Sequence, residues 1–313
     1  MTSPRRTLIG LAAVGIGVCT LLAVISGEHN VHRGAYAALA LGTGWGFIGT
    51  GLYAWSRSLR SHMGPLMIAV GFAALLKALA FSNDSVIFTI ASLGEVLIYA
   101  LLIHLLLSFP SGRLDSRLDR LLVAIAYFNT TVVQLAAFVL NDPQQGCAHC
   151  PVNPLLIDHA DTAAGVINAA QLDISIAVLG AVVAILYRRW RDGGHSQRRG
   201  FAPVLAVGGL SFVLLMSSLI VEQAGLSSSI DDGLTLALFS TLACLPFAFL
   251  IGLLRFRFSQ AEAVSSLVAR LGGGVGRGSV RDALAEALGG PEVELAYWVP
   301  SQVSYVEGKQ HSR

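Results

Sequence analysis

Long apolar runs alternate with short polar connections through most of the 313-residue chain. Each run is about 20 residues long, the length of α-helix that crosses the hydrocarbon core of a bilayer. Only helices and closed barrels satisfy their backbone groups in lipid, and these runs are too long for barrel strands. The pattern therefore predicts an all-α polytopic membrane protein with eight transmembrane helices, at about 7–26, 34–55, 64–82, 86–109, 121–140, 163–187, 201–222 and 233–254.

Composition and charge support the membrane assignment and set its orientation. Hydrophobic residues make up 54% of the chain and charged residues only 13%, which excludes a soluble globular domain and a disordered chain. Basic residues gather in alternate connections, whereas the intervening connections carry only Arg33. Because basic connections stay cytoplasmic, both termini are expected on the inner side of the membrane. The net charge of +2 reflects this bias and indicates no nucleic-acid partner.

Four ionisable side chains lie in the interior of the apolar runs, away from their ends, where a charge is costly and is therefore a candidate for function. They are Lys77, Glu95, His104 and Asp173. Glu95 and Asp173 are expected at similar depth, and Lys77 on the preceding run is close enough to pair with Glu95. Such a pair could fix helix register or switch between two packings. An ion or proton path and snorkelling of Lys77 to the outer interface are the alternatives, and the lack of repeated halves favours the pair.

The longest outer connection carries Cys147, His149 and Cys150. Two cysteines three positions apart outside the cytoplasm favour a local disulfide, Cys147–Cys150. The alternative is a redox or metal sensor, because thiolates together with His149, Asp158 and His159 could bind zinc or copper. We expect the structural disulfide, and no cofactor is indicated.

Glycines in two places allow more than one interpretation. Gly42 and Gly46 on the second run form a small-xxx-small pair, which we expect to pack within the bundle in preference to joining two chains. The glycine run at 272–278 follows a predicted helix rather than a strand and has no lysine before Ser279. It is therefore a linker and not a phosphate-binding loop.

The chain divides into a membrane part, 1–254, and two cytoplasmic segments, 255–278 and 279–313. No Gly or Pro interrupts 255–271, so the last span is expected to continue inward as a signalling helix before the glycine-rich linker. The pattern at 279–289 predicts a capped helix, and alternation at 293–299 and 303–306 predicts two paired strands. One helix and two strands cannot bury a stable core, so 279–313 is interpreted as the incomplete start of an α+β domain.

Three stretches carry a family resemblance. They are Phe109-Pro110-Ser111-Gly112-Arg113-Leu114 after the fourth run, the outer 147–156 with Asn153 and Pro154, and the tail at 280–289 with 294–300, which includes Tyr297 and Trp298. Together they resemble the N-terminal membrane sensor region of actinobacterial two-component sensor histidine kinases. The resemblance covers nearly the whole chain, and it implies that 279–313 begins a GAF-like segment.

The resemblance also implies what should follow the sensor region. In the family, a dimerisation helix with the phosphoryl-accepting histidine and an ATP-binding domain come next, and nothing in this sequence matches either. We therefore expect the sensory input module of such a kinase, truncated or split from its kinase half, and no autokinase activity from this chain alone. The implied setting is the bacterial plasma membrane. The implied partners are the lipid bilayer, a second copy joined through a kinase half, and the kinase half or a response regulator bound through the cytoplasmic tail.

Three rival functions remain open at this stage. The first is a transporter or channel that uses the intramembrane residues Glu95, Asp173 and Lys77. The second is a membrane-embedded enzyme, and the third is a non-catalytic anchor for a cytoplasmic partner. The sequence names no catalytic residue for any of them.

Overall fold

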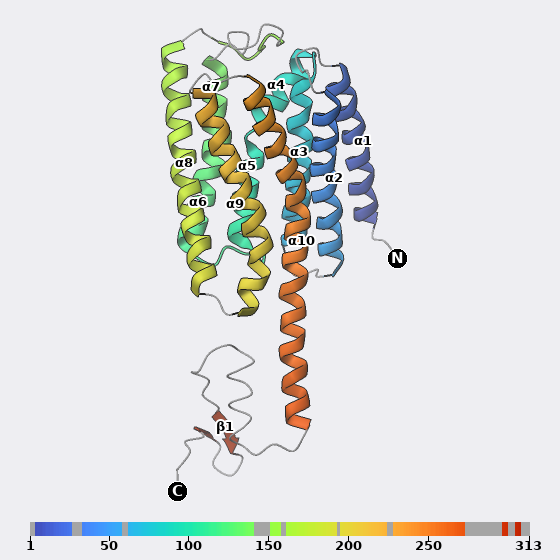
Figure 1. Cartoon of the computed structure of the whole chain (residues 1–313), viewed down its shortest axis with the longest axis vertical. Helices are drawn as coiled ribbons and strands as arrows, with labels where there is room; N and C mark the ends of the chain where they lie inside the picture. Colours follow the sequence, from blue (N-terminus) through green and yellow to red (C-terminus); the bar gives the residue numbers. More distant parts are fainter. Residues whose placement is uncertain are drawn as a thin grey trace.

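A computed structural model describes residues 4–26, 33–57, 62–140, 151–157, 161–192, 195–223, 228–272, 296–299 and 304–307. These residues form a helical bundle with one helix that extends beyond it (Figure 1). The elements in chain order are α1 (Pro4–Ser26), α2 (Arg33–Arg57), α3 (Met63–Ala78), η1 (Leu79–Phe81), α4 (Ser85–Gly94), α5 (Leu97–Ser108), α6 (Arg117–Phe128), η2 (Asn129–Val133), α7 (Gln134–Leu140), α8 (Asp161–Asp192), α9 (His195–Gln223), α10 (Ser228–Gly272), β1 (Ala296–Val299) and β2 (Ser304–Glu307).

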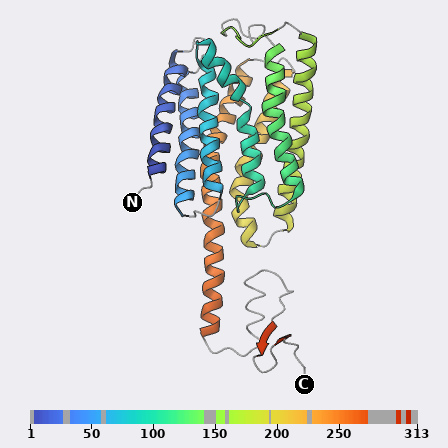
Figure 2. The same ribbon diagram turned by 180° about the vertical axis from the view of Figure 1, so that it is seen from behind.

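Six stretches of the described chain are long and apolar enough to cross a membrane. They are Thr7–Ile25, Met63–Phe81, Ser85–Ser108, Arg117–Leu140, Thr162–Asp192 and Gly233–Arg255. The expected spans at 34–55 and 201–222 are not among them, although α2 and α9 run alongside the others in the bundle (Figure 2). Glycine, threonine and other weakly apolar residues dilute the hydropathy of α2, and α9 contributes a shorter apolar stretch, Gly200–Ser211.

Two of the membrane-length stretches, Ser85–Ser108 and Arg117–Leu140, are not regular α-helices throughout. Between α4 and α5 the backbone tightens, because the Glu95 N–H donates to Ser92 O and the Tyr99 N–H donates to Val96 O, each three residues back. Between α6 and α7, the η2 segment widens to a π-helix. Both irregular segments lie inside apolar stretches, where a freed backbone group must find a partner in the protein.

Helices α2 and α3 approach each other through four glycines, which we call the α2–α3 glycine contact. A Cβ on Gly71 would lie 2.6 Å from Gly44 O, and a Cβ on Gly51 would lie 2.9 Å from Gly64 O. The two pairs are seven residues apart on each helix and run in opposite directions, as two antiparallel helices require. Glycine is needed at these positions because any side chain would push the backbones apart.

The predicted Gly42 and Gly46 pair does not form this contact. Nothing lies within 4 Å of a Cβ added to Gly42, and Gly46 faces the Pro246 ring on α10. The expectation of packing within the bundle therefore applies to Gly46 but not to Gly42. Only a shift of two positions along α2 separates the predicted pair from Gly44, so spacing alone could not choose the helix face.

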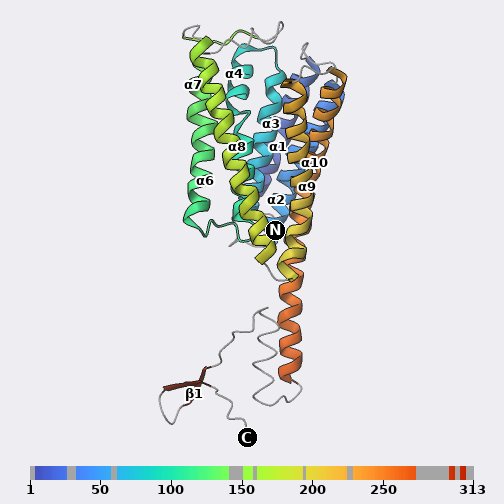
Figure 3. The same ribbon diagram turned by 60° about the vertical axis from the view of Figure 1, so that its left-hand side comes forward.

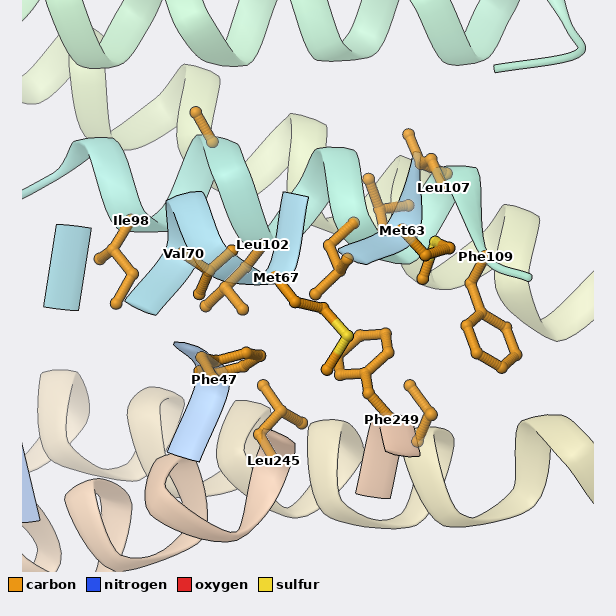
Figure 4. Close-up of a cluster of buried hydrophobic side chains, with 14 of the residues drawn as sticks. Phe47, Met63, Met67, Val70, Ile98, Leu102, Leu107, Phe109, Leu245 and Phe249 are labelled. Carbon is orange, nitrogen blue, oxygen red and sulfur yellow. The ribbon is translucent and has the colours of Figure 1, made fainter. Parts of the chain in front are cut away.

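The largest apolar core lies between α3 and α5 on one side and α2 and α10 on the other (Figure 4). Phe47, Met67 and Phe249 are almost fully buried at its centre. Phe249 also contacts Phe47 and Phe109, with ring centroids 6.4 Å and 5.8 Å apart. The core therefore joins α10 to the rest of the bundle near the end at which α10 leaves it.

Helix α10 is a single 45-residue element that begins in the bundle and extends well beyond it (Figure 3). It packs along α9 and α2 within the bundle. At the far end of the described chain, β1 and β2 pair antiparallel, with Tyr297 opposite Val306 and Trp298 opposite Tyr305. The predicted continuation of the last span as a helix beyond the bundle and the predicted strand pairing are both present. The helix expected at 279–289 lies outside the described residues.

Candidate functional site

Lys77 on α3 forms an ion pair with Glu95, which lies between α4 and α5. The Lys77 Nζ is 3.1 Å from Glu95 Oε1 and 3.4 Å from the Tyr99 hydroxyl. The same ammonium lies over the Tyr99 ring at 5.3 Å and over the Phe239 ring of α10 at 5.8 Å, within the range of cation–π attraction. One charged group therefore contacts α3, α5 and α10, which come together at this point from distant parts of the sequence.

The position of the pair follows from the break between α4 and α5. The carbonyl groups at the end of α4 carry partial negative charge, which favours the Lys77 ammonium nearby. Glu95 lies two residues before Leu97, the first residue of α5, whose first N–H groups carry partial positive charge and favour a carboxylate. The Lys77 side chain is mostly buried and the Glu95 side chain is partly exposed, so the pair is neither fully buried nor free in solvent.

Replacing either partner of this pair should cost more than replacing both. We expect Lys77→Met and Glu95→Gln each to lower the free energy of unfolding by about 1–3 kcal/mol, less than the full cost of breaking a buried pair because Glu95 is partly exposed. The double variant should lose less stability than either single variant, so the coupling energy should exceed the larger of the two single losses. Unfolding in mixed micelles measures this cycle, and a Lys77→Met, Arg191→Met cycle is the additive control. Additive losses for Lys77 and Glu95 would show that the pair contributes no coupling energy.

A second polar group lies around the π-helical segment. Asn129 is buried, and its amide nitrogen donates to Gln171 O at 3.1 Å and to Ser175 Oγ at 3.0 Å, both on α8. The Gln171 amide donates in turn to Gln134 Oε1 at 2.8 Å. These amides connect η2 and α7 to α8 where the widened helix exposes its backbone. This group was not predicted from the sequence, although Asn129, Gln134 and Gln171 are amide side chains inside apolar runs and were the available signal.

His104 belongs to a separate contact in the same half of the bundle. Its Nδ1 is 3.2 Å from the Tyr127 hydroxyl, and the two rings meet edge to face. This contact joins α5 to α6. The structure therefore brings Lys77 and Glu95 together but gives His104 a different partner.

Arg189 and Asp119 form an ion pair that the sequence analysis did not predict. The Arg189 Nη2 is 2.6 Å from Asp119 Oδ2, and its Nη1 donates to Leu107 O at 2.7 Å at the end of α5. Asp119 is 1% exposed and also accepts the Ser116 N–H in a capping box at the start of α6. The guanidinium thus joins the ends of α5, α6 and α8. The Ser116-x-x-Asp119 spacing was the available signal.

The Phe109–Leu114 stretch lies beside the point where α10 leaves the bundle. The Phe109 ring packs edge-on against Phe201 of α9 and Phe249 of α10, at 5.1 Å and 5.8 Å between centroids. Pro110 follows a cis peptide bond, and Gly112 has φ of +78°, a conformation that favours glycine. A Cβ on Gly112 would also meet the backbone of Met63 at 2.6 Å. The stretch therefore holds a tight turn against the start of α3, while its Arg113 is exposed.

The segment 151–157 packs against the end of α7. Asn153 is buried and donates to Phe138 O of α7 at 2.7 Å, while its Oδ1 accepts the Leu155 N–H at 3.0 Å around the exposed Pro154. Cys147, His149 and Cys150, with Asp158 and His159, lie outside the described residues, so the disulfide and the metal sensor both stay predictions. Cys19 and Cys244 are free thiols. Within the described part of the chain, no His, Cys, Asp or Glu residues gather as a metal site.

Asp173 does not join any of these contacts. It is exposed on α8, whereas Lys77 and Glu95 meet near α10, so the structure does not bring the three residues together as one path.

No family model, curated protein or solved structure matches the chain.

Proposed function

We propose that the chain is the membrane-embedded sensory input module of a two-component sensor histidine kinase. In this proposal, the protein lies in a bacterial plasma membrane with eight spans, α2 and α9 included, and both termini are cytoplasmic. A homodimer would form through a kinase half, and the cytoplasmic tail would bind the kinase half or the response regulator. The family resemblance supports the proposal at Phe109–Leu114, Asn153–Pro154 and Tyr297–Trp298.

The observation that carries the proposal is the continuity of α10. One helix contacts the Lys77 pair within the bundle through Phe239, contacts the Phe109 turn through Phe249, and continues to Gly272. A continuous helix transmits rotation or tilt along its length, which a flexible tether does not. A change in packing around Lys77 can therefore reach the cytoplasmic end without an intermediate element.

Helix α10 contains a pivot on which such a change could act. Pro246 has no N–H to donate to the carbonyl four residues earlier, and its ring crowds that carbonyl, so the helix is weakened there. Beyond the pivot, Gly252 packs so closely on α9 that an added Cβ would lie 2.6 Å from Gly200 O. A stimulus would favour one of two packings around these contacts, and α10 would carry the bias inward.

Inserting alanines into α10 after Arg257 tests this mechanism in the full chain fused to a kinase half. Two added residues rotate the distal helix by about 200°, whereas seven return it to within about 20° of its original phase. We expect two alanines to lock the output of a response-regulator reporter at one level. With seven alanines inserted, the reporter output should again change when Lys77 is replaced by Met, as it does without the insertion. Equal outputs after both insertions would show that α10 is only a tether.

A transporter or channel is the second candidate, because the α4–α5 break places Glu95 and Lys77 inside an apolar stretch. Broken spans with charged residues are typical of transport sites. Ion flux through vesicles that contain the purified chain, abolished by Glu95→Gln, would favour this candidate over signalling. If neither the unchanged chain nor Glu95→Gln conducts ions, and the response-regulator reporter still responds, the input module is favoured.

A further inference from the structure

The Lys77 ammonium lies in a cage formed by one carboxylate and two aromatic rings, Glu95, Tyr99 and Phe239, which we call the ammonium cage. Glu95 Oε1 is 3.1 Å from the Lys77 Nζ, and the Tyr99 hydroxyl is 3.4 Å from it. The ring centroids of Tyr99 and Phe239 are 5.3 Å and 5.8 Å from the same nitrogen. Aromatic ring faces around a cation are the means by which proteins recognise organic ammonium groups, quaternary ones included.

Helix α3 supplies the cation but none of the cage. Glu95 lies between α4 and α5, Tyr99 is on α5, and Phe239 is on α10. The Lys77 ammonium reaches them at the end of a flexible four-carbon side chain, so it occupies the cage as a tethered ligand. Lys77 is in the last turn of α3, and its long side chain can turn toward the polar interface when it is displaced. The cage can therefore exchange one cation for another while its own walls stay in place.

The exposure of the cage and its depth define the class of cation that fits. The Glu95 side chain is 43% exposed, whereas the Lys77 side chain is 21% exposed, so the cage is more open at its carboxylate. Glu95 lies roughly 15 Å along the apolar stretch that begins at Ser85, and a ligand that reaches this depth from lipid needs an apolar body. One carboxylate, one hydroxyl and two ring faces suit an organic cation, whereas Ca²⁺ and Mg²⁺ require about six or more oxygen ligands.

We propose that the ammonium cage binds a lipophilic organic cation, an ammonium group attached to an apolar chain, in competition with Lys77. The bound cation takes over the ion pair with Glu95 and the contacts with the two rings. Helices α5 and α10 stay joined through the ligand, while α3 loses its charged link to both. Binding at the cage is argued from geometry alone, whereas a role for this cation as the stimulus rests on the proposed function.

Equilibrium binding of radiolabelled octyltrimethylammonium to the full chain in phosphatidylcholine vesicles tests the proposal, with binding to protein-free vesicles subtracted. Lys77→Ala should raise the affinity on the order of tenfold, because the tethered competitor is gone and Glu95 has lost its cation. Lys77→Met should raise it by less, because the methionine side chain still reaches the cage. Glu95→Gln and Phe239→Leu should each lower the affinity by about three- to tenfold. Asp173→Asn, which removes an exposed carboxyl group on α8, is the matched control and should leave the affinity unchanged.

Photolabelling of the unaltered chain gives a measurement that does not depend on a stable variant. An octylammonium compound with a diazirine beside the ammonium group should label Ser85–Ser108 and Gly233–Arg255, and excess octyltrimethylammonium should suppress this labelling. Saturable labelling confined to other helices would overturn the proposal. An affinity in the folded Lys77→Ala chain that is no higher than in the unaltered chain would overturn it as well. So would equal losses of affinity in Glu95→Gln and Asp173→Asn.

The response-regulator reporter separates the binding site from the proposed function. If octyltrimethylammonium changes the output of the chain fused to a kinase half, and Glu95→Gln abolishes that change, both are supported. Binding with an unchanged output would support the site and contradict the role of the cation as the stimulus. No binding, with an output that still responds to Lys77→Met, would overturn the site and leave the input module standing.

Discussion

Arg189→Met is expected to lower the free energy of unfolding by about 3 kcal/mol, because it leaves Asp119 buried without its cation. Arg189 is partly exposed at 28%, which places the expected loss at the lower end of the range for broken buried pairs. The Leu107 carbonyl at the end of α5 loses a charged donor at the same time. Three helix ends lose one common partner, so the effect should exceed that of breaking an exposed ion pair in the same part of the described bundle. Unfolding monitored by circular dichroism in mixed micelles measures it.

A neighbouring arginine provides the matched control. Arg191 pairs with Asp192 at 3.3 Å, but both side chains are about two-thirds exposed, at 66% and 68%. Arg191→Met should therefore change stability by less than about 1 kcal/mol. Combining Arg189→Met with Asp119→Leu removes both charges and should recover part of the loss. If Arg189→Met costs no more than Arg191→Met, the Asp119 pair does not hold the helix ends together.

Gly71→Ala should destabilise the bundle by about 1–3 kcal/mol although it adds only one methyl group. The new Cβ would lie 2.6 Å from Gly44 O and 2.6 Å from the Ile48 side chain, so α2 and α3 must separate. The loss should appear as a lower midpoint of unfolding in the same micelles. Gly51→Ala should behave similarly, because its Cβ would meet Gly64 O at 2.9 Å.

Gly49→Ala on α2 is the control for this prediction. No atom lies within 4 Å of a Cβ at Gly49, so the substitution should be neutral or stabilise the helix by up to about 1 kcal/mol. The two changes are chemically identical and differ only in what the methyl group meets. Equal effects at Gly71 and Gly49 would rule out the α2–α3 glycine contact.

The sequence predicted the helical bundle and part of the candidate site for clear physical reasons. Apolar runs of membrane-spanning length are a strong signal, and six of the eight expected spans satisfy it in the described chain. The Lys77–Glu95 pair could be anticipated because each charge has few partners of opposite sign at its depth. The break between α4 and α5 was not predicted, because a single glycine, Gly94, lies near it and no proline accompanies that glycine.

The remaining contacts depend on helix rotation, which one sequence leaves open. Residue type and spacing do not distinguish Gly42 from Gly44, yet only Gly44 faces α3. The π-helical segment at Asn129–Val133 changes which way the side chains of α7 face, and it contains no glycine or proline that would have indicated an irregular helix. Asp119 was missed because a charged residue beside a basic connection is ordinarily a solvated one. Rotation is set by packing, and packing is visible only once the bundle is assembled.

The length of α10 beyond the bundle turns it into a lever. From Pro246 to Gly272 the helix spans roughly 39 Å, so a tilt of about 10° about Pro246 moves its far end by about 7 Å. The helix at Pro246 itself, the fulcrum, hardly moves. Side chains around the fulcrum therefore need to shift by only fractions of an ångström for a partner at the far end to be moved by several.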